Sequence, residues 1–245
     1  MLEIKNWTIK NFNQENLVIK NLNLSFKEEQ LVAIIGSSGV GKTTLLNSIA
    51  LNTKILEGEL IFNNSKINLT KKRKWKNYRK NIGIISQKNT LIEDSSVFDN
   101  LKYVISERNN FFFKLFSIIT KKQKWEIFDV LSKLDIISKT FYNVKDLSGG
   151  EAQRVEIAKL IIRKPKIILA DEPTSNLDLL NSKKVIELIK QIAQKEKAIA
   201  IINLHDVEQL KNNIDKVIGI KNQKIAFEKK PKDISKQDLK KLYEK

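Results

Sequence analysis

Three short, unbroken apolar runs limit the folds open to this chain. They are Leu31–Ile35, Ile167–Ala170 and Ala198–Ile202. A strand with one wet face alternates apolar and polar residues, as Leu22–Phe26 and Glu59–Phe62 do here, whereas a strand covered on both faces is apolar throughout. Each run is also far shorter than the ~20 residues that a membrane-spanning helix needs. The runs therefore predict buried strands of a parallel sheet covered by helices.

Helical patterns alternate with these runs. We expect helices over residues 43–50, 121–137, 151–163 and 181–194. Strands that alternate with helices indicate an α/β architecture with right-handed crossovers. Residues 88–155 carry mainly helical patterns, which predicts a helical subdomain inserted into a core made of residues 1–87 and 156–245. We expect residues 1–245 to form a single domain of this kind.

Glycine is scarce and unevenly placed. The chain of 245 residues has 8 glycines, where average usage would give about 17. Most of them fall in two clusters, at positions 36–41 and 149–150. Glycine is needed where a side chain would keep the backbone away from a ligand. The two clusters are therefore where we expect the functional site.

The first cluster has the form of a phosphate-binding loop, G-x4-G-K-[ST]. It reads Gly36-Ser37-Ser38-Gly39-Val40-Gly41-Lys42-Thr43-Thr44 and lies between a predicted buried strand and a predicted helix. Backbone N–H groups and the helix N-terminus would bind phosphate oxygens. Lys42 would reach the β- and γ-phosphates, and the Thr43 hydroxyl would bind Mg²⁺. The structural alternative is a glycine-rich turn that only caps a helix.

A pair of carboxylates ends the second apolar run. Asp171 and Glu172 follow Ile167–Ala170 and precede Pro173, at the strand end where open α/β sheets place their sites. Asp171 would hold Mg²⁺, and Glu172 would accept a proton from the attacking water. The structural alternative is a turn that simply terminates the strand.

The second glycine cluster begins a helix. The segment Leu147-Ser148-Gly149-Gly150-Glu151 contains a capping box, because Ser148 is followed three residues later by Glu151. A capping box does not explain two adjacent glycines in a chain that otherwise avoids them. Bare N–H groups at an exposed helix start suggest a second phosphate site.

Together these motifs resemble the ATP-binding cassette (ABC) ATPases. The phosphate loop, Leu147–Glu151 and Leu169–Pro173 occur in the order found in that family, and the resemblance covers essentially the whole chain. It implies a P-loop NTPase with a RecA-like parallel-sheet core, an N-terminal antiparallel β subdomain and a helical subdomain that carries the signature motif, Ser148–Glu151. It also implies ATP and Mg²⁺ as cofactors.

The resemblance implies further site residues. Gln87 is similar to the family's lid glutamine, which contacts Mg²⁺ and the attacking water. Asp178 lies in a loop similar to the one that crosses the dimer seam, and His205 is similar to the switch histidine that senses the γ-phosphate. Phe12 is the candidate for the aromatic ring that stacks on adenine, with Trp7 as its competitor.

The resemblance also implies an assembly. In this family the signature motif of one subunit covers the ATP that the phosphate loop of another subunit holds. We therefore expect a head-to-tail homodimer around two Mg-ATP molecules. No residue of the catalytic set is replaced, so both sites should be competent.

Charge and rare residues exclude other classes. The chain has no cysteine and one histidine, which excludes disulfide scaffolds, Cys-ligated metals and multi-His centres. Its net charge of +17 has two possible explanations. Either a codon bias enriches the chain in Lys, Asn and Ile, or the charge serves to attract the protein to an anionic surface. The densest basic run, residues 71–80, includes Trp75 and Tyr78. It is either a solvated helix face or a nucleic-acid patch.

The C-terminal third contains four segments, Asn203–Leu210, Asp215–Ile220, Ile225–Phe227 and Leu239–Glu244. Through these segments it resembles the ATP-binding subunits of phosphonate-type importers, as in AT-rich, wall-less bacteria. This resemblance implies separate integral-membrane permease subunits, a solute-binding lipoprotein and a position on the cytoplasmic face of the cell membrane. It leaves the solute open among phosphonates, thiamine and others. An exporter or lipoprotein-release ATPase would share every catalytic motif. A nucleic-acid-associated ABC protein is the third alternative, but nucleic acid is not an expected partner, because the chain lacks tandem cassettes and zinc cysteines.

Overall fold

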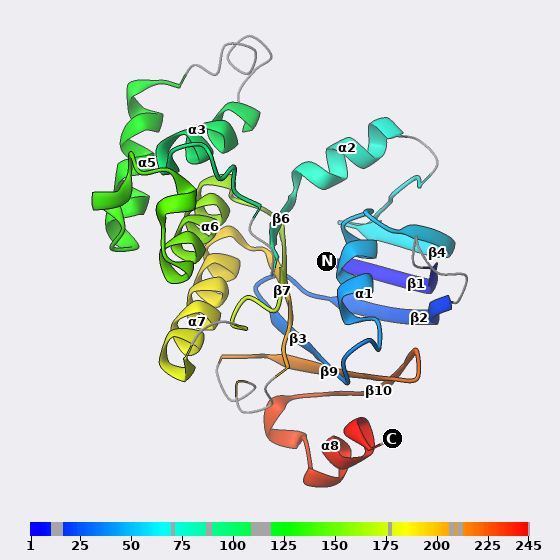
Figure 1. Cartoon of the computed structure of the whole chain (residues 1–245). Coiled ribbons are helices and arrows are strands. Elements are labelled where there is room, and N and C mark those ends of the chain that lie inside the picture. The colour runs from blue at the N-terminus through cyan, green and yellow to red at the C-terminus, as the bar shows by residue number, and fades with distance from the viewer. Residues whose placement is uncertain are drawn as a thin grey trace. The chain divides into compact units, whose positions relative to one another are not determined.

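The computed structural model describes residues 1–10, 17–69, 72–86, 90–108, 119–175, 178–205, 209 and 213–244. Contacts divide the chain into two compact units. The first joins Met1–Ile84 to Pro165–Lys245, and the second is Ile85–Lys164. The labelled helices α3, α5 and α6 belong to the second unit (Figure 1). The fold is therefore α/β with a helical part, as the sequence predicts.

An antiparallel sheet forms the N-terminal part of the first unit. Its strands lie in the order β2-β1-β4-β5. The bounds are β1 (Leu2–Lys10), β2 (Leu17–Phe26), β4 (Lys54–Phe62) and β5 (Ser65–Lys66). Leu22, Leu24 and Phe26 are buried while the residues between them are exposed, which is the pattern of a sheet with one wet face.

A second sheet carries the predicted buried strands. Its order is β10-β9-β3-β8-β7-β6. The bounds are β3 (Leu31–Ile35), β6 (Ile82–Ile85), β7 (Ile167–Asp171), β8 (Ile199–Asn203), β9 (Lys216–Lys221) and β10 (Lys224–Lys229). Strands β3, β7, β8 and β9 pair in parallel, and β10 is antiparallel to β9. Every residue of β3 and β8 is buried, which confirms the sequence-based expectation of strands covered on both faces.

In the described part of the first unit, four segments form α-helices. They are α1 (Lys42–Ile49), α2 (Lys72–Lys80), α7 (Leu179–Glu196) and α8 (Lys236–Tyr243). Helix α1 contacts β1 and β4 of one sheet and β7 and β8 of the other. The apolar face of α7 is buried through Ile186, Ile189 and Ala193. The core of this unit thus joins both sheets around α1.

The basic run forms helix α2. Tyr78 on this helix is buried, and Trp75 packs partly buried against the same core. The two aromatic residues therefore serve packing and are not presented between the lysines as stacking surfaces for bases. Among the described residues, no helix combines the length and the apolarity that crossing a bilayer would require.

The second unit is helical. It contains α3 (Val97–Arg108), α5 (Lys121–Lys133) and α6 (Gly149–Arg163), which share a core that includes Leu101, Leu131 and Val155. The subdomain boundary expected at residue 155 falls inside α6. Because Ala158 and Ile162 belong to this same core, the whole helix lies in the second unit.

Candidate active site

The phosphate loop lies between β3 and α1, with Ser37, Ser38 and Gly39 exposed. Lys42 is 5% exposed, and its ammonium donates hydrogen bonds to the carbonyl oxygens of Gly36 at 2.8 Å and Ser37 at 3.1 Å. Burial lowers the pKa of Lys42 below its ordinary value, and the Glu172 and Asp171 carboxylates act in the opposite direction. The loop therefore holds a cation at its centre.

Two glycines of the loop are required by the fold itself. Gly41 caps α1 with a φ of +108°, and a Cβ there would lie 2.7 Å from Val18 Cγ1. Gly36 has a φ of +151°, and its Cβ would lie 2.4 Å from the carbonyl oxygen of Ile220. Left-handed backbone and close contacts exclude a side chain at both positions. The glycine pattern is visible in the sequence, and the structure adds this steric reason for it.

Asp171 ends β7 beside the loop. Its Oδ1 accepts hydrogen bonds from Thr43 Oγ1 at 3.1 Å and from Asn203 Nδ2 at 2.6 Å. A hydroxyl and a carboxylate oxygen side by side suit Mg²⁺, which prefers oxygen ligands and usually adds substrate phosphates and water. The donor set fits Mg²⁺, and Thr43 and Asp171 are the residues that would hold it. The structure thus brings together the two residues that the sequence singled out for the metal.

Glu172 and His205 meet at the same edge of the sheet. Glu172 Oε1 is hydrogen-bonded to His205 Nε2. The Glu172 side chain is 18% exposed and that of His205 is 47% exposed. Glu172 has left-handed backbone, with a φ of +51°, a conformation that a residue without glycine's freedom keeps only when its surroundings hold it. The candidate base and the candidate switch histidine are therefore direct neighbours.

A buried hydrogen bond lies just beyond this pair. Thr174 Oγ1 donates to Gln209 Oε1 at 2.8 Å, and both residues are buried. Thr174 follows Glu172 by two positions and Gln209 follows His205 by four. The bond therefore links the chain after β7 to the chain after β8, next to the candidate base.

The signature motif begins α6. Ser148 is the N-cap, its Oγ accepts a hydrogen bond from the Glu151 N–H at 3.3 Å, and Glu151 Oε2 accepts one from the Ser148 N–H at 2.8 Å. These bonds hold the pKa of the Glu151 carboxyl below its usual range. The capping box read from the sequence is therefore present.

Nothing in the packing or the backbone conformation of the described residues requires glycine at the two adjacent glycine positions of this motif. Apart from the adjacent residues and the backbone of α6 itself, no atom of the described residues lies within 4 Å of a Cβ built at Gly149 or Gly150, and neither has a positive φ. The fold would accept alanine at both positions. These glycines contrast with Gly36 and Gly41, whose side-chain positions are filled by their own fold.

The remaining candidates separate into three groups. Asp178 caps α7, where N–H groups of Asn181 and Leu180 bond its carboxylate and hold its pKa below the usual range. Gln87 and Phe12 lie outside the described residues. Trp7, the alternative to Phe12, is fully buried and donates its indole N–H to Ser48 Oγ at 2.9 Å. The expectation that Trp7 competes for adenine is therefore wrong, because it has no exposed face.

Two residues of the site were missed by sequence reasoning. Asn203 is fully buried and orients Asp171, and Gln209 bonds Thr174. A signal was present for Asn203, since it is the first polar residue after the apolar run Ala198–Ile202. Nothing in the local sequence marks Gln209.

Comparisons with known proteins agree with this geometry. Residues 19–175 match the family described as ABC transporter. The chain is 41% identical over 242 residues to "Probable ABC transporter ATP-binding protein p29" of Mesomycoplasma hyorhinis, covering 99% of this chain and 96% of that protein. It is 37% identical over 231 residues to "Phosphonates import ATP-binding protein PhnC" of Mesoplasma florum, covering 92% and 93%.

Solved structures share the fold. The chain matches one described as "Dimeric Structure of MJ0796, a Bacterial ABC Transporter Cassette" with a TM-score of 0.82 and 27% identity, covering 96% of this chain and all of that one. A second structure of that protein, with the same TM-score and identity, is a post-hydrolysis state bound to ADP and Pi. The extent of these matches and the geometry of the site lead to one conclusion: the chain belongs to the ABC transporter family, as one of its ATP-binding subunits, and is an ATPase.

Proposed function

We propose that two copies of this chain pair head to tail around two Mg-ATP molecules and power solute import through a separate membrane permease. Each site would combine the phosphate loop of one protomer with the signature motif, Ser148–Glu151, of its partner. The sterically unfilled positions of Gly149, which is exposed, and of Gly150, which is partly buried, are the observation that carries this proposal. Bare backbone at a helix start suits a phosphate brought by another molecule.

The residues of the first unit supply the chemistry. Lys42 would bind the β- and γ-phosphates, and Thr43 and Asp171 would hold Mg²⁺ with Asn203 orienting the carboxylate. Bound Mg²⁺ neutralises charge on the phosphate oxygens. Glu172 would take the proton of the water whose oxygen bonds to the γ-phosphorus as the bond to ADP breaks. His205, hydrogen-bonded to Glu172, would sense the γ-phosphate. Gln87, Phe12 and Asp178 keep their expected roles as part of this proposal.

An arginine in the signature motif tests the shared site. Ser148→Arg places a long cation where the partner's nucleotide would lie, so we expect ATPase activity to fall by about a hundredfold or more. Nucleotide binding to the monomer, followed with a fluorescent ATP analogue, should stay unchanged. Ser132→Arg on the exposed surface of α5 is the matched control. Loss of nucleotide binding by the Ser148→Arg monomer would contradict the shared-site arrangement.

An aromatic patch on the second unit supports a permease partner. The patch consists of Phe98, Trp125, Phe128 and Phe141, whose neighbouring rings lie 5.9 to 6.5 Å apart. Trp125 is 73% exposed and Phe141 is 71% exposed. Exposed apolar clusters of this kind mark interaction surfaces. Binding there would hold the ATPase on the cytoplasmic face of the membrane.

Import of a phosphonate-type solute is the finer part of the proposal. It is supported by relatives named as phosphonate importers, such as the one from Mesoplasma florum at 37% identity. The test is to copurify the chain with the permease and lipoprotein encoded beside it and to measure ATPase in vesicles. Stimulation by the lipoprotein loaded with a phosphonate supports it. Stimulation by thiamine alone, or outward transport, overturns the solute or the direction.

A further inference from the structure

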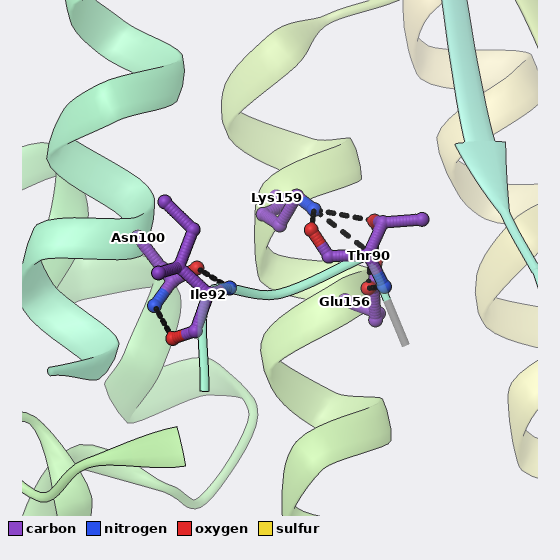
Figure 2. Close-up of polar contacts among 5 residues, drawn as sticks. All are labelled: Thr90, Ile92, Asn100, Glu156 and Lys159. Atoms are coloured by element: carbon purple, nitrogen blue, oxygen red, sulfur yellow. Dashed lines mark hydrogen bonds and ion pairs between the residues drawn. The ribbon is translucent and has the colours of Figure 1, made fainter. Parts of the chain in front are cut away.

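A buried carboxylate lies on α6 outside the site described above. Glu156 is 2% exposed, and its Oε1 accepts hydrogen bonds from the Thr90 N–H at 2.7 Å and from Thr90 Oγ1 at 2.8 Å. Figure 2 shows Glu156 on its helix pointing toward the extended segment that contains Thr90. A charged residue buried to this degree needs partners. Thr90 supplies them through both its backbone and its side chain.

Lys159 completes the contact from the next turn of α6. Its Nζ donates to Thr90 Oγ1 at 2.6 Å and to the Thr90 carbonyl oxygen at 3.2 Å. It also lies 3.5 Å from Glu156 Oε2. The hydroxyl of Thr90 can therefore donate to the carboxylate while it accepts from the ammonium. We name these three residues, Thr90, Glu156 and Lys159, the Thr90 clamp.

A second side chain holds the same segment from α3. Asn100 is 5% exposed. Its Oδ1 accepts from the Ile92 N–H at 2.8 Å, and its Nδ2 donates to the Ile92 carbonyl oxygen at 3.1 Å, as Figure 2 also shows. Residues 90–92 are thus fixed by side chains of two helices.

Stability alone is a poor reason for such a clamp. The neighbours of Glu156 on α6, Val155 and Ile157, are buried and apolar. Replacing a buried ion pair by apolar side chains of similar size is often neutral or stabilising, whereas the pair fixes one geometry. The clamp therefore fits a role in holding a defined position of the chain.

We propose that Glu156 and Lys159 are positioning residues for ATP hydrolysis. Helix α6 begins at the signature motif, and Thr90 stands three positions after Gln87. The clamp ties the chain that follows Gln87 to the signature helix, so that a displacement of α6 is passed to this glutamine. This inference rests on the proposed function, which gives Gln87 its contact with Mg²⁺ and water.

The clamp is tested by removing one hydroxyl. Thr90→Val keeps the shape and the N–H group but removes the bonds of Oγ1 to Glu156 and Lys159. We expect kcat to fall about tenfold with the KM for ATP within about twofold, because small misplacements of a catalytic group lower turnover more than binding. Thr90→Ser, which restores the hydroxyl, should stay within about twofold of the wild-type kcat. Thermal unfolding verifies that each variant folds, and Glu156→Gln replaces Thr90→Val if that variant does not.

A double-mutant cycle distinguishes positioning from a structural role. In a Gln87→Ala background, Thr90→Val should lower kcat by less than about twofold more, since both changes act through the same group. An equal loss in both backgrounds overturns the clamp and leaves the proposed function standing. If Gln87→Ala itself does not lower kcat, the glutamine assignment and the clamp both fall. If the wild-type protein does not hydrolyse ATP, the proposed function fails.

Discussion

The side-chain amide of Asn203 donates a hydrogen bond to Oδ1 of Asp171 at 2.6 Å, across the paired ends of β8 and β7. Asn203 is fully buried, and the same carboxylate oxygen accepts from Thr43 Oγ1. Asn203 therefore fixes the direction of the carboxylate proposed to hold Mg²⁺. Second-layer partners of this kind commonly affect metal affinity strongly.

Replacing Asn203 tests this relationship. Asn203→Leu keeps a similar branched shape but removes the donor to Asp171. We expect the Mg²⁺ concentration for half-maximal ATPase activity to rise about tenfold, with a smaller effect on the affinity for metal-free ATP. Titrating Mg²⁺ at saturating ATP measures this. An unchanged Mg²⁺ dependence in a folded variant would show that Asn203 does not act through Asp171.

The role of Glu172 predicts a separation of binding from turnover. Glu172→Gln removes the proton acceptor but preserves size, so hydrolysis should fall by about a hundredfold or more. ATP should still bind, and gel filtration with Mg-ATP should show accumulated dimers. Glu57→Gln, at an exposed position of β4, is the control. If Glu172→Gln hydrolyses ATP normally, the assignment of the base is wrong.

Replacing Gly150 by alanine should raise the stability of the monomer and lower its ATPase activity. Because a Cβ at Gly150 meets no described atom within 4 Å beyond the adjacent residues and the backbone of α6, and its φ is not positive, Gly150→Ala should stabilise the monomer by about 0.5 kcal/mol. The same change should lower ATPase and ATP-driven dimerisation. Gly58→Ala provides the contrast, since its Cβ would lie 2.7 Å from the carbonyl oxygens of Asn6 and Lys5, and it should destabilise the fold. Full activity of Gly150→Ala would count against a nucleotide contact there.

The Thr174–Gln209 bond predicts non-additive changes in stability. Thr174→Val alone leaves the buried Gln209 amide without its donor, which should lower the free energy of unfolding by about 1–3 kcal/mol. Gln209→Leu alone should have a similar effect. The double variant should recover most of the loss, because both polar groups are then removed. Urea unfolding measures all three proteins, and simple additivity would contradict the coupling.

The stability of helix α8 should decrease at acid pH. Hydrogen bonds from Lys229 and from Ser235 lower the pKa of Asp238, the third residue of α8, from its ordinary 3.8 to about 2. A lowered folded-state pKa means that the stabilisation is complete above about pH 4 and is lost as the pH falls toward 2. The protection factors of the α8 amides, which correct exchange rates for their intrinsic pH dependence, should therefore fall over this interval. In Asp238→Asn these protection factors should be low already at pH 7 and change little with acid.

Local pattern was enough for much of this molecule. The apolar runs predicted β3, β7 and β8, because a strand that is covered on both faces is apolar at successive positions of its own sequence. The capping box at Ser148 was readable because its two residues lie within one helical turn. The phosphate loop could be recognised in the same way, from one short segment of sequence. Thr43 and Asp171 were assigned to one site because each motif follows or ends a predicted buried strand.

Contacts between distant residues were decided only by the tertiary structure. Asn203 meets Asp171 because β7 and β8 are paired in one register, and Glu156 meets Thr90 across 66 positions of chain. Strand register and helix packing produce no periodic pattern in the sequence around the residues that they bring together. The burial of Trp7 against Ser48 has the same origin. The sequence by itself therefore determined the elements and the motifs, whereas chain packing decided which side chains orient the site, because orientation depends on neighbours that the local sequence does not contain.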